Sequence, residues 1–418
     1  MYSLLIHFYA FIVALISPFH RKARLMRFGQ WKTNSILREK INRNAKYIWF
    51  HASSLGEFEQ GRPLIEKIKE QYPGYKILLT FFSPSGYEVR KNYSGADVIC
   101  YLPFDTPYRV KKFLNLVNPV MAVFIKYEFW GNYLRELKKR GIPVYIISAI
   151  FRPDQLFFQW FGVPYRKMLH CFTHLFVQDG RSKELLEQYG IHNVTVYGDT
   201  RFDRVLDVCN QARELPEVEQ FVSSCRSFKD STGKRCQTLI AGSSWPQDEE
   251  ILIPYFNEHP EMKLIIAPHE IHKEHLMYIE SLLKRPSVRL SDVMLDKSLL
   301  EGKDCLIVDS FGLLSSIYRY GTIAYIGGGF GAGIHNTLEA AVYGIPVLFG
   351  PRFQKFKEAR DLIKVGGGFS VASKDEFVAR MDELLTYTEV LKATGESAGQ
   401  FVKGNAGATD GILKDLAL

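Results

Sequence analysis

The sequence lacks the patterns that identify several common classes of enzyme. Its six cysteines, at positions 100, 171, 209, 225, 236 and 305, form no CxxC pair, and its eleven histidines form no HExxH arrangement. This spacing argues against a structural zinc site and is typical of a reducing compartment. The sequence also has no P-loop, so an NTPase is not supported.

Charge is absent from one long stretch. No charged side chain occurs in Met1–Phe19, and Arg21 and Lys22 follow directly. An apolar run of about 18 residues is near the lower limit for crossing a bilayer. We interpret residues 1–20 as a membrane anchor, spanning the bilayer or lying in its surface, with the basic residues on the cytoplasmic side. A buried helix is the alternative; a cleaved signal peptide is disfavoured because no basic residue precedes the run.

The net charge of +8 and the pI near 9.0 favour an anionic partner. They do not choose between nucleic acid, phospholipid and sugar nucleotide. No RNP, zinc-finger or homeodomain pattern is present, so nucleic acid is not expected. Ordinary proportions of hydrophobic (46%) and charged (23%) residues argue against disorder or a collagen-like chain.

Apolar runs alternate with amphipathic stretches along the chain after residue 20. Continuous apolar strands separated by helices predict parallel sheets covered on both faces, and 418 residues exceed what one hydrophobic core usually serves. We therefore predict an α/β protein with two doubly wound, Rossmann-like domains. The expected strands are 47–52, 76–82, 97–102, 122–125, 144–150, 174–178 and 194–198 in the first domain, and 238–241, 263–267, 305–309, 322–326, 347–349 and 369–371 in the second. Helices are expected at 63–71, 110–117, 130–140 and 182–189.

A polar stretch interrupts this alternation. The segment from Cys209 to Arg235 contains KDSTGKR and no clear strand, and we interpret it as a helix followed by a linker. The predicted domains are 21–208 and 209–418, and the last helix of the second could pack back on the first. Ligands of such folds bind at the carboxyl ends of parallel strands, so we expect the chemistry in strand-to-helix loops.

The first informative loop is His51–Glu57 (HASSLGE), directly after the first predicted strand. Its small residues and Gly56 allow a tight turn into a helix that begins near Glu57. A carboxylate at this place could accept a proton from a hydroxyl group. Spacing alone favours a plainer interpretation, an acidic residue that complements the helix dipole.

The second loop is Gly327–Glu339, where five glycines lie between a strand and a helix expected to start near Asn336. Glycines let backbone N–H groups approach a phosphate, and a helix N-terminus favours negative charge. Glu339 could accept hydrogen bonds from ribose hydroxyls. We predict a phosphate-binding loop. Packing glycines are the alternative, and NAD binding is disfavoured because a dinucleotide fingerprint opens the first strand of its domain.

Three further loops follow predicted strands of the second domain and should line the same edge of its sheet. Taken singly, serine and glycine after a strand are ordinary turn residues; together with the glycine loop they describe a nucleotide pocket. His272 and His275, three residues apart, are interpreted as part of a solvated face. The three loops are Gly242–Trp245, Pro268–Glu270 and Ser310–Leu313.

The order and spacing of several motifs resemble those of 3-deoxy-D-manno-octulosonic acid (Kdo) transferases. The similarity extends from the N-terminal run to about residue 365, and no single motif carries it. The motifs are HASSLGE (51–57), YLPFDTP (101–107), YEFW (127–130), GDTRFD (198–203), GSSWPQDEE (242–250), APHE (267–270), VDSFG (308–312) and HNTLEAAVYGIPVLFGP (335–351).

The resemblance implies an inverting GT-B glycosyltransferase whose two Rossmann-like domains face each other across a cleft, with no cofactor and no metal. It implies transfer of Kdo from CMP-Kdo to the lipid A precursor, in lipopolysaccharide biosynthesis at the cytoplasmic face of the inner membrane. Glu57 matches the family's proton acceptor, and Arg201 matches a basic position assigned to transition-state stabilisation; Glu128 is a further candidate. The predicted CMP-binding residues are Ser243, Ser244, Pro268, His269, Phe311, Gly312, Leu313, Gly331, Asn336, Thr337, Leu338 and Glu339, of which the two serines and Gly331 come from the loop pattern alone.

Three positions depart from the family pattern. His269 stands where many members have an arginine, so its contact with a phosphate could be weaker or depend on pH. Leu313 replaces the usual glutamate, which leaves only its backbone as a contact. Lys126 lies where many members have an acidic residue, and its role stays open.

Two other functions stay open. A GT-B transferase that uses a different nucleotide sugar has the same general pattern, and a non-catalytic nucleotide- or lipid-binding protein would keep the pocket without the reaction. The second is disfavoured because Glu57 and the full pocket set are both present. The expected partners are CMP-Kdo, the lipid A precursor and inner-membrane lipids. An aromatic and basic rim at 151–161 could contact acyl chains, or could be ordinary packing.

Overall fold

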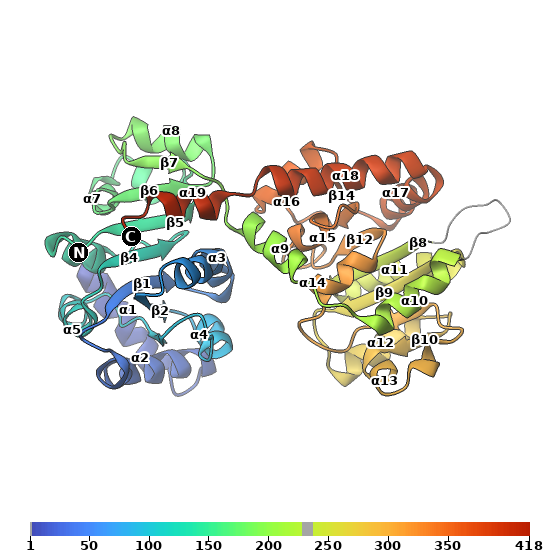
Figure 1. Ribbon diagram of the computed structural model, residues 1–418, viewed down its shortest axis with the longest axis horizontal. Coiled ribbons are helices and arrows are strands. Elements are labelled where there is room, and N and C mark those ends of the chain that lie inside the picture. Colours follow the sequence, from blue (N-terminus) through green and yellow to red (C-terminus); the bar gives the residue numbers. More distant parts are fainter. Residues whose placement is uncertain (1, 228–236) are drawn as a thin grey trace. The chain divides into compact units, whose positions relative to one another are not determined.

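Two compact units make up the chain (Figure 1). The computed structural model describes residues 2–227 and 237–418. Unit 1 runs to Arg204 and is completed by Ala406–Leu418, and unit 2 is Val205–Asn405. The boundary predicted at residue 208 lies close to this division. The KDSTGKR segment, predicted as a linker, lies outside the described residues.

A seven-stranded parallel sheet forms the centre of unit 1, in the order β3-β2-β1-β4-β5-β6-β7. Because the first strand lies in the middle, the chain reverses its direction of travel between β1 and β4. Doubly wound folds bind ligands at such a reversal, outside the carboxyl ends of the strands. The strands are β1 (Lys46–Ala52), β2 (Tyr75–Phe81), β3 (Val98–Tyr101), β4 (Met121–Ile125), β5 (Val144–Ala149), β6 (His174–Val177) and β7 (Val194–Val196).

Both faces of this sheet are buried, as the continuous apolar strands predict. In β1, Tyr47 and Trp49 pack into one hydrophobic cluster while Ile48 and Phe50 pack into another, because successive side chains of a strand point to opposite faces. Helices therefore cover both sides (Figure 1). They are α3 (Leu55–Gln71), α4 (Pro84–Arg90), α5 (Pro107–Val117), α6 (Gly131–Lys139), α7 (Val163–Leu169) and α8 (Gly180–Gln188), with a 3-10 helix η1 (Leu156–Phe158), and α9 (Arg201–Asn210) leads out of the unit.

The end of the chain returns to unit 1 as α19 (Ala408–Asp415). Ile412 and Leu413 are buried in the same cluster as Ile48 and Phe50. The carboxylate of Asp203 accepts hydrogen bonds from the backbone N–H groups of Gly407 and Thr409, the latter at 2.7 Å. The last helix thus packs on the N-terminal unit, through both apolar burial and a carboxylate that caps its start.

The apolar N-terminal run forms part of two helices rather than one long one. α1 (Tyr2–Ile16) ends before a turn, and α2 (Arg21–Lys40) continues at 117° to it. No single helix among residues 2–227 and 237–418 is long and apolar enough to cross a membrane; the bent pair passes that test only jointly, by length and composition. The single anchor helix predicted over 1–20 is not confirmed, because the chain turns at 17–19 and His20 caps a new helix.

α1 packs on unit 1 with one side only. Val13 is buried beside Phe104, and the ring of Tyr9 lies 5.8 Å from that of Phe104 and 6.3 Å from that of Phe82. At the start of the helix, the Tyr2 hydroxyl donates a 2.6 Å hydrogen bond to the buried Asp105 carboxylate. The opposite side exposes large apolar side chains: Leu4, Leu5, Phe8, Phe11, Leu15 and, beyond the helix, Phe19.

The aromatic rim predicted at 151–161 divides into two parts. Phe151, Phe157 and Phe158 are buried in the core of unit 1, as ordinary packing predicts. Trp160, 90% exposed, and the partly exposed Phe161 lie on the surface. Trp160 and Phe161, together with the exposed Arg152 and Leu156, are the side chains of the rim that are available for contact with another molecule.

A second parallel sheet forms the centre of unit 2, in the order β10-β11-β9-β8-β12-β13-β14. Its reversal point lies between β8 and β12. Six of its strands were predicted, and β10 was missed because its three residues include a single apolar side chain, Val288. The strands are β8 (Gln237–Ser244), β9 (Met262–Pro268), β10 (Ser287–Arg289), β11 (Cys305–Ile307), β12 (Ile323–Ile326), β13 (Val347–Phe349) and β14 (Gly368–Ser370).

The helices of unit 2 cover its sheet on both faces (Figure 1). They are α10 (Pro216–Ser227), α11 (Pro246–Glu258), α12 (Lys273–Leu282), α13 (Leu290–Leu295), α14 (Leu314–Ile317), α15 (Leu338–Ala341), α16 (Lys357–Lys364), α17 (Lys374–Thr386) and α18 (Thr388–Gly404), with 3-10 helices η2 (Lys297–Leu300) and η3 (Tyr318–Tyr320). The stretch predicted as one helix after residue 209 contains the end of α9 and all of α10.

Candidate active site

Glu57 lies at the carboxyl edge of the unit 1 sheet, in the first turn of α3. Its Oε2 accepts hydrogen bonds from the backbone N–H groups of Ser53 (2.6 Å) and Ser54 (3.2 Å). The carboxylate therefore does complement the start of the helix, as the plainer interpretation holds. No hydrogen bond to Oε1 occurs within the described part of the chain, so this oxygen stays able to accept a proton.

Glu128 stands beside this position, on the loop after β4, the strand next to β1. Its side chain is buried, and Oε2 lies 2.9 Å from Nε2 of His51 and 2.5 Å from Nε1 of Trp130. His51 itself is fully buried at the end of β1. The reversal of the sheet thus brings together residues 77 positions apart in the sequence.

The contacts of His51 tie the end of β1 to β2 and to the loop after β4. Its Nδ1 lies 2.9 Å from the Thr80 hydroxyl oxygen and 3.1 Å from the Thr80 carbonyl oxygen. Its Nε2 lies 2.9 Å from Oε2 of Glu128 and accepts a hydrogen bond from Nε1 of Trp130 at 3.0 Å. His51 and Glu128 therefore form one buried, hydrogen-bonded unit.

The two glutamates have opposite pKa shifts. Burial raises the pKa of Glu57 to about 7, and the negative charge of Glu128 adds to this effect, against the opposing N–H groups of Ser53 and Ser54. Burial also disfavours ionisation of Glu128, but hydrogen bonds from His51, Ser53 and Trp130 hold its pKa below the ordinary value. Glu128 is therefore the ionised member of the pair, and Glu57 the one able to take up a proton near neutral pH.

Lys126 lies on the same loop in a left-handed backbone conformation (φ 63°), which is rare for a residue with a side chain. Its N–H donates to the Ile147 carbonyl at 2.9 Å, and its ammonium lies 5.3 Å from the centre of the Tyr127 ring. The positive charge of Lys126 lowers the pKa of Glu57 and so partly offsets Glu128. The lysine that departs from the family pattern is thus close enough to act on the candidate base.

Arg201 begins α9, after the last strand of the unit 1 sheet. Its guanidinium pairs with the buried Asp199 carboxylate, with Nε and Nη2 at 2.9 and 2.7 Å from Oδ2. The neighbouring Thr200 hydroxyl bonds to the carbonyl oxygen of Gln60 in α3. The arginine is therefore held by its own loop, and that loop is tied to the helix that starts with Glu57.

Three aromatic rings meet at the carboxyl edge of the unit 2 sheet. The ring of His269, after β9, stacks on Trp245, after β8, at 4.7 Å and on His335 at 4.4 Å. Trp245 Nε1 also donates to His335 Nε2 at 3.2 Å. Burial, followed by the neighbouring His269, lowers the pKa of His335 to about 4, so His335 is neutral at pH 7. Sequence reasoning brought these loops together but assigned no role to Trp245 or His335.

A buried carboxylate links two of these loops. Asp248, in α11, accepts hydrogen bonds from the backbone N–H groups of Trp245 (3.0 Å) and Gly328 (2.8 Å) and from the hydroxyl of Tyr325 (2.8 Å). It fixes the glycine loop against the end of β8. The sequence signal was present, since two acidic residues, 248 and 249, follow a proline at the start of an apolar helix.

Ser244 and His275 are engaged inside unit 2. The Ser244 hydroxyl donates to buried Glu249 at 2.8 Å, and His275 Nε2 lies 2.9 Å from the same carboxylate. The interpretation of His275 as solvated is wrong, because its side chain is buried between α12 and α11. His272 caps α12 instead. Of the two predicted serines, only Ser243, with φ 53°, is left with an exposed portion at the loop.

The glycine loop approaches other backbone segments very closely. A Cβ on Gly327 would lie 2.2 Å from the Ser243 carbonyl oxygen, and Gly333 has φ 136°. The helix expected to start near Asn336 begins at Leu338: α15 has four residues, Leu338–Ala341, and the Asn336 side chain bonds to the Leu338 N–H and to Glu339. Glu339 is thus already held by a neighbour.

Two buried hydroxyls at this edge, the Oγ of Ser310 and the Oγ1 of Thr337, have no hydrogen-bond partner among the described residues. Buried polar atoms are rarely left unpaired, which makes both candidates for binding a ligand. Phe311, in the same loop as Ser310, is 75% exposed, and Gly312 has φ 82°. The remaining predicted residues lie on these same loops: Pro268 ends β9, Leu313 precedes α14, Gly331 accepts from Arg352, and Leu338 is buried in α15.

No group of three or more His, Cys, Asp or Glu side chains with the geometry of a metal site occurs in residues 2–227 and 237–418. The polar groups that gather at the two sheet edges are instead a carboxylate pair in unit 1 and rings, hydroxyls and backbone N–H groups in unit 2.

Comparisons with known proteins agree with these features. The family model described as 3-deoxy-D-manno-octulosonic-acid transferase (kdotransferase) matches residues 23–204. The 3-deoxy-D-manno-octulosonic acid transferase of Aquifex aeolicus is 28% identical over 365 residues, which cover 85% of this chain and 90% of the relative. That of Rickettsia felis is 26% identical over 377 residues, covering 88% of this chain and 78% of the relative.

Among solved structures, UDP-GlcNAc 2-epimerase from Neisseria meningitidis bound to UDP-GlcNAc is similar with a TM-score of 0.61 at 14% identity, covering 88% of this chain and 98% of that chain. At this identity the similarity concerns the fold alone. The predicted α/β fold with two parallel sheets is confirmed. The family match over residues 23–204 and the relatives that span most of the chain confirm the resemblance to 3-deoxy-D-manno-octulosonic acid transferases, which are glycosyltransferases.

Proposed function

We propose that this chain transfers Kdo from CMP-Kdo to a sugar hydroxyl of a lipid A precursor, in lipopolysaccharide biosynthesis, with inversion at the anomeric carbon and without a metal ion. The observation that carries the proposal is Glu57. Its carboxyl group lies at the reversal of the unit 1 sheet, keeps Oε1 free of partners within the described residues, and has its pKa raised by burial to about 7. A general base is most effective when its pKa lies near the working pH.

In this reaction the acceptor hydroxyl oxygen forms a bond to the anomeric carbon of Kdo while the bond from that carbon to the phosphate oxygen of CMP breaks. The hydroxyl proton passes to Oε1 of Glu57, and CMP leaves with the electron pair. General-base catalysis of this kind contributes about 10²–10⁴ in rate, or about 3–5 kcal/mol. Because CMP is already a good leaving group, fixed hydrogen-bond donors can take the place of a metal ion.

Unit 2 supplies the nucleotide contacts in this proposal. Ser310 and Thr337 each offer a buried hydroxyl without a partner, and the close-packed glycine loop offers backbone N–H groups to a phosphate. The stacked rings of Trp245, His269 and His335 add a flat apolar wall. Arg201, oriented by Asp199, stabilises the charge that develops on the leaving phosphate.

The acceptor and the location follow from α1. Its exposed apolar side and the basic residues that open α2, Arg21, Lys22 and Arg24, form the kind of helix that lies in the surface of an anionic membrane. A lipid acceptor in the cytoplasmic leaflet of the inner membrane would be reached from there. We propose attachment in the membrane surface rather than a span.

The test is Glu57→Ala, with CMP binding and Kdo transfer measured separately. We expect transfer to fall by at least a hundredfold while the affinity for CMP stays within twofold. Glu70→Ala, on the exposed side of the same helix, is the matched control and should leave both unchanged. Transfer near the wild-type rate in Glu57→Ala would refute the assigned base. Stabilisation by UDP rather than CMP in a thermal shift would point instead to a transferase for another nucleotide sugar.

A further inference from the structure

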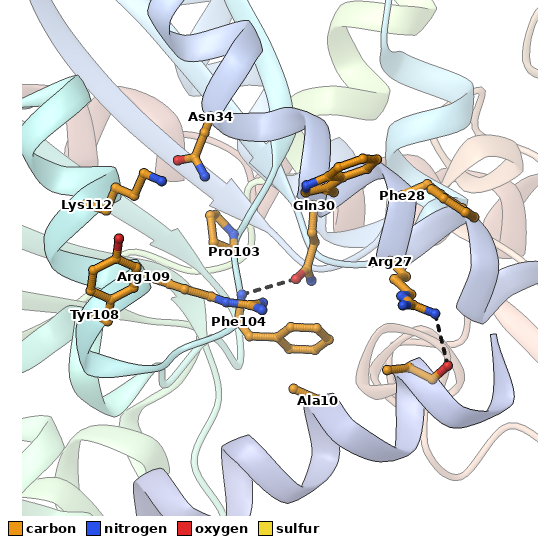
Figure 2. Close-up of a pocket in the computed structure, with 12 residues that line it drawn as sticks. Ala10, Arg27, Phe28, Gln30, Asn34, Pro103, Phe104, Tyr108, Arg109 and Lys112 are labelled. Carbon is orange, nitrogen blue, oxygen red and sulfur yellow. Dashed lines mark hydrogen bonds between the residues drawn. The ribbon is translucent and has the colours of Figure 1, made fainter.

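A pocket of about 560 Å³ lies in unit 1 between α1, α2 and the segment that leads from β3 into α5 (Figure 2). None of the residues assigned above to the reaction lines it. Part of its wall is apolar, formed by Ala10 and Ala14 of α1, Phe28 and Trp31 of α2, and Phe104. Phe28 and Trp31 are 50% and 78% exposed, so the pocket opens beside the exposed side of α1.

Three cations line the same pocket, and no carboxylate does. Arg109 and Lys112 of α5 stand on one side and Arg27 of α2 on the other (Figure 2). The Arg109 guanidinium lies 5.5 Å from the centre of the Phe104 ring, and Arg27 Nη1 donates to Ser17 Oγ at 2.9 Å. Within the described residues none of the three forms an ion pair with a carboxylate. The pocket therefore keeps its full positive charge.

A buried amide adds a directed donor. Gln30 is 94% buried, and its Oε1 accepts a hydrogen bond from the Phe104 backbone N–H at 3.2 Å (Figure 2). That bond fixes which end of the amide is oxygen, and the Nε2 group is left without a hydrogen-bond partner in the part of the chain that the structure describes. A buried donor without a partner is rare in a folded protein. An anionic oxygen in the pocket would supply the missing acceptor.

We propose that this pocket binds the phosphate headgroup of a membrane lipid, with the Gln30 Nε2 group and the cations on the phosphate and an acyl chain along Ala10, Phe28 and Trp31. The apolar wall does not suit a free phosphate ion, and three uncompensated cations do not suit a neutral lipid. The exposed apolar side of α1 continues from the pocket towards the place where acyl chains would lie. The inference rests on the proposed membrane attachment and is independent of the role of Glu57.

The test is calorimetric titration of the full chain with dihexanoyl phosphatidic acid below its micellar concentration. Arg109→Ala/Lys112→Ala should weaken binding by at least about tenfold, since it removes two charge-assisted contacts. Lys40→Ala/Arg43→Ala removes the same charge from exposed positions outside the pocket and should change affinity less than twofold. Equal loss in both double variants would mean diffuse attraction to the surface and would overturn the site.

The variant Gln30→Glu distinguishes binding inside the pocket from general attraction of the lipid to a positively charged surface. The carboxylate keeps an acceptor for the Phe104 N–H but replaces the donor by a negative oxygen, so binding should again fall at least about tenfold. If inorganic phosphate binds as tightly as the lipid, the pocket is a plain anion site and the proposal is overturned. If dihexanoyl phosphatidylcholine binds as tightly, the pocket is an apolar groove, and the proposal is overturned as well. Because binding is read without Kdo transfer, a failure of the proposed reaction leaves this result unaffected.

Discussion

The carboxyl edges of the two sheets carry different kinds of chemical group. In unit 1 the edge is made of ionisable side chains, with Glu57 and Glu128 close together and His51 buried behind them. In unit 2 it is made of stacked rings and close-packed backbone, with His335 kept neutral at pH 7. Both edges occupy the reversal point of a doubly wound sheet, so the same topology supports two kinds of site.

This difference predicts opposite responses to pH. A glutamate whose pKa is raised on folding costs stability as pH rises, because the folded state must give up a proton that it holds more tightly than the unfolded chain. A histidine whose pKa is lowered on folding costs stability as pH falls, because the unfolded chain takes up a proton that the folded state refuses. Ionisation at the edge of unit 1 should therefore lower the stability of the fold as pH rises, and protonation at the edge of unit 2 should lower it as pH falls.

The largest effect expected is a loss of stability when a side chain is added to the closely packed glycine loop of unit 2. In Gly327→Ala the new Cβ would lie 2.2 Å from the Ser243 carbonyl oxygen, and no flexible side chain can move aside. We expect a loss of at least about 3 kcal/mol, since overpacking against backbone is costly. At the matching edge of unit 1, Gly56 lies in the first turn of α3; in Gly56→Ala the new Cβ meets nothing within 4 Å, and stability should change by less than about 1 kcal/mol. Chemical denaturation of both variants measures this; equal losses would show that the two glycines are packed alike.

The next effect is the cost of ionising Glu57. Its pKa of about 7 in the folded state exceeds the ordinary value of 4.5, so the cost appears between these values and is complete above pH 7. Glu57→Gln should therefore be more stable than the wild type at pH 8, by about 1 to 3 kcal/mol, with no such difference near pH 4. Thermal unfolding at the two pH values tests this. A variant that is less stable at pH 8 than at pH 4, relative to wild type, would contradict the raised pKa.

A smaller effect is expected on the pH dependence of transfer. Glu128→Gln removes a negative charge that raises the pKa of Glu57, so the acidic limb of the profile of kcat/KM against pH should move to lower pH. The amide keeps a hydrogen-bonding group beside His51. Lys126→Met removes a charge that lowers the same pKa, and it should move the limb the opposite way. Two shifts in the same direction would show that the charges do not act through Glu57.

The features that could be predicted from the sequence alone differ between these two edges. The place of Glu57 followed from a strand, small residues and a helix start, and the strands themselves followed from apolar runs. The unit of His51 and Glu128 did not, because its partners are 77 residues apart and meet only through the order of strands in the sheet. The prediction that His275 lies on a solvated face was also wrong, because its side chain is buried in contact with Glu249 of another helix.

In unit 2 the glycine loop was predicted but its geometry was not. The sequence predicted a helix that starts near Asn336, but it did not show that α15 has only four residues or that Gly344, with φ 71°, follows it. Asp248 lies in the GSSWPQDEE motif at 242–250, but nothing in the sequence shows that it binds the Gly328 N–H. Local patterns predict which loops gather at an edge; the hydrogen bonds between loops depend on tertiary packing.

The smallest effect expected comes from His335, and it completes the contrast between the edges. With a folded-state pKa near 4 against an ordinary value of 6.5, the neutral ring costs the protein stability as pH falls through that window. In His335→Phe the stack on His269 is kept and the titration is lost, so stability should fall about 1 to 2 kcal/mol less than in the wild type between pH 7 and pH 4. Denaturation curves at both pH values measure the difference. The variant also removes the acceptor for Trp245 Nε1, so we expect its stability to be lower by the same amount at both pH values. The test is therefore the change in stability between pH 7 and pH 4. If the two proteins lose stability in parallel, acid acts elsewhere and the edge of unit 2 does not respond to pH through this ring.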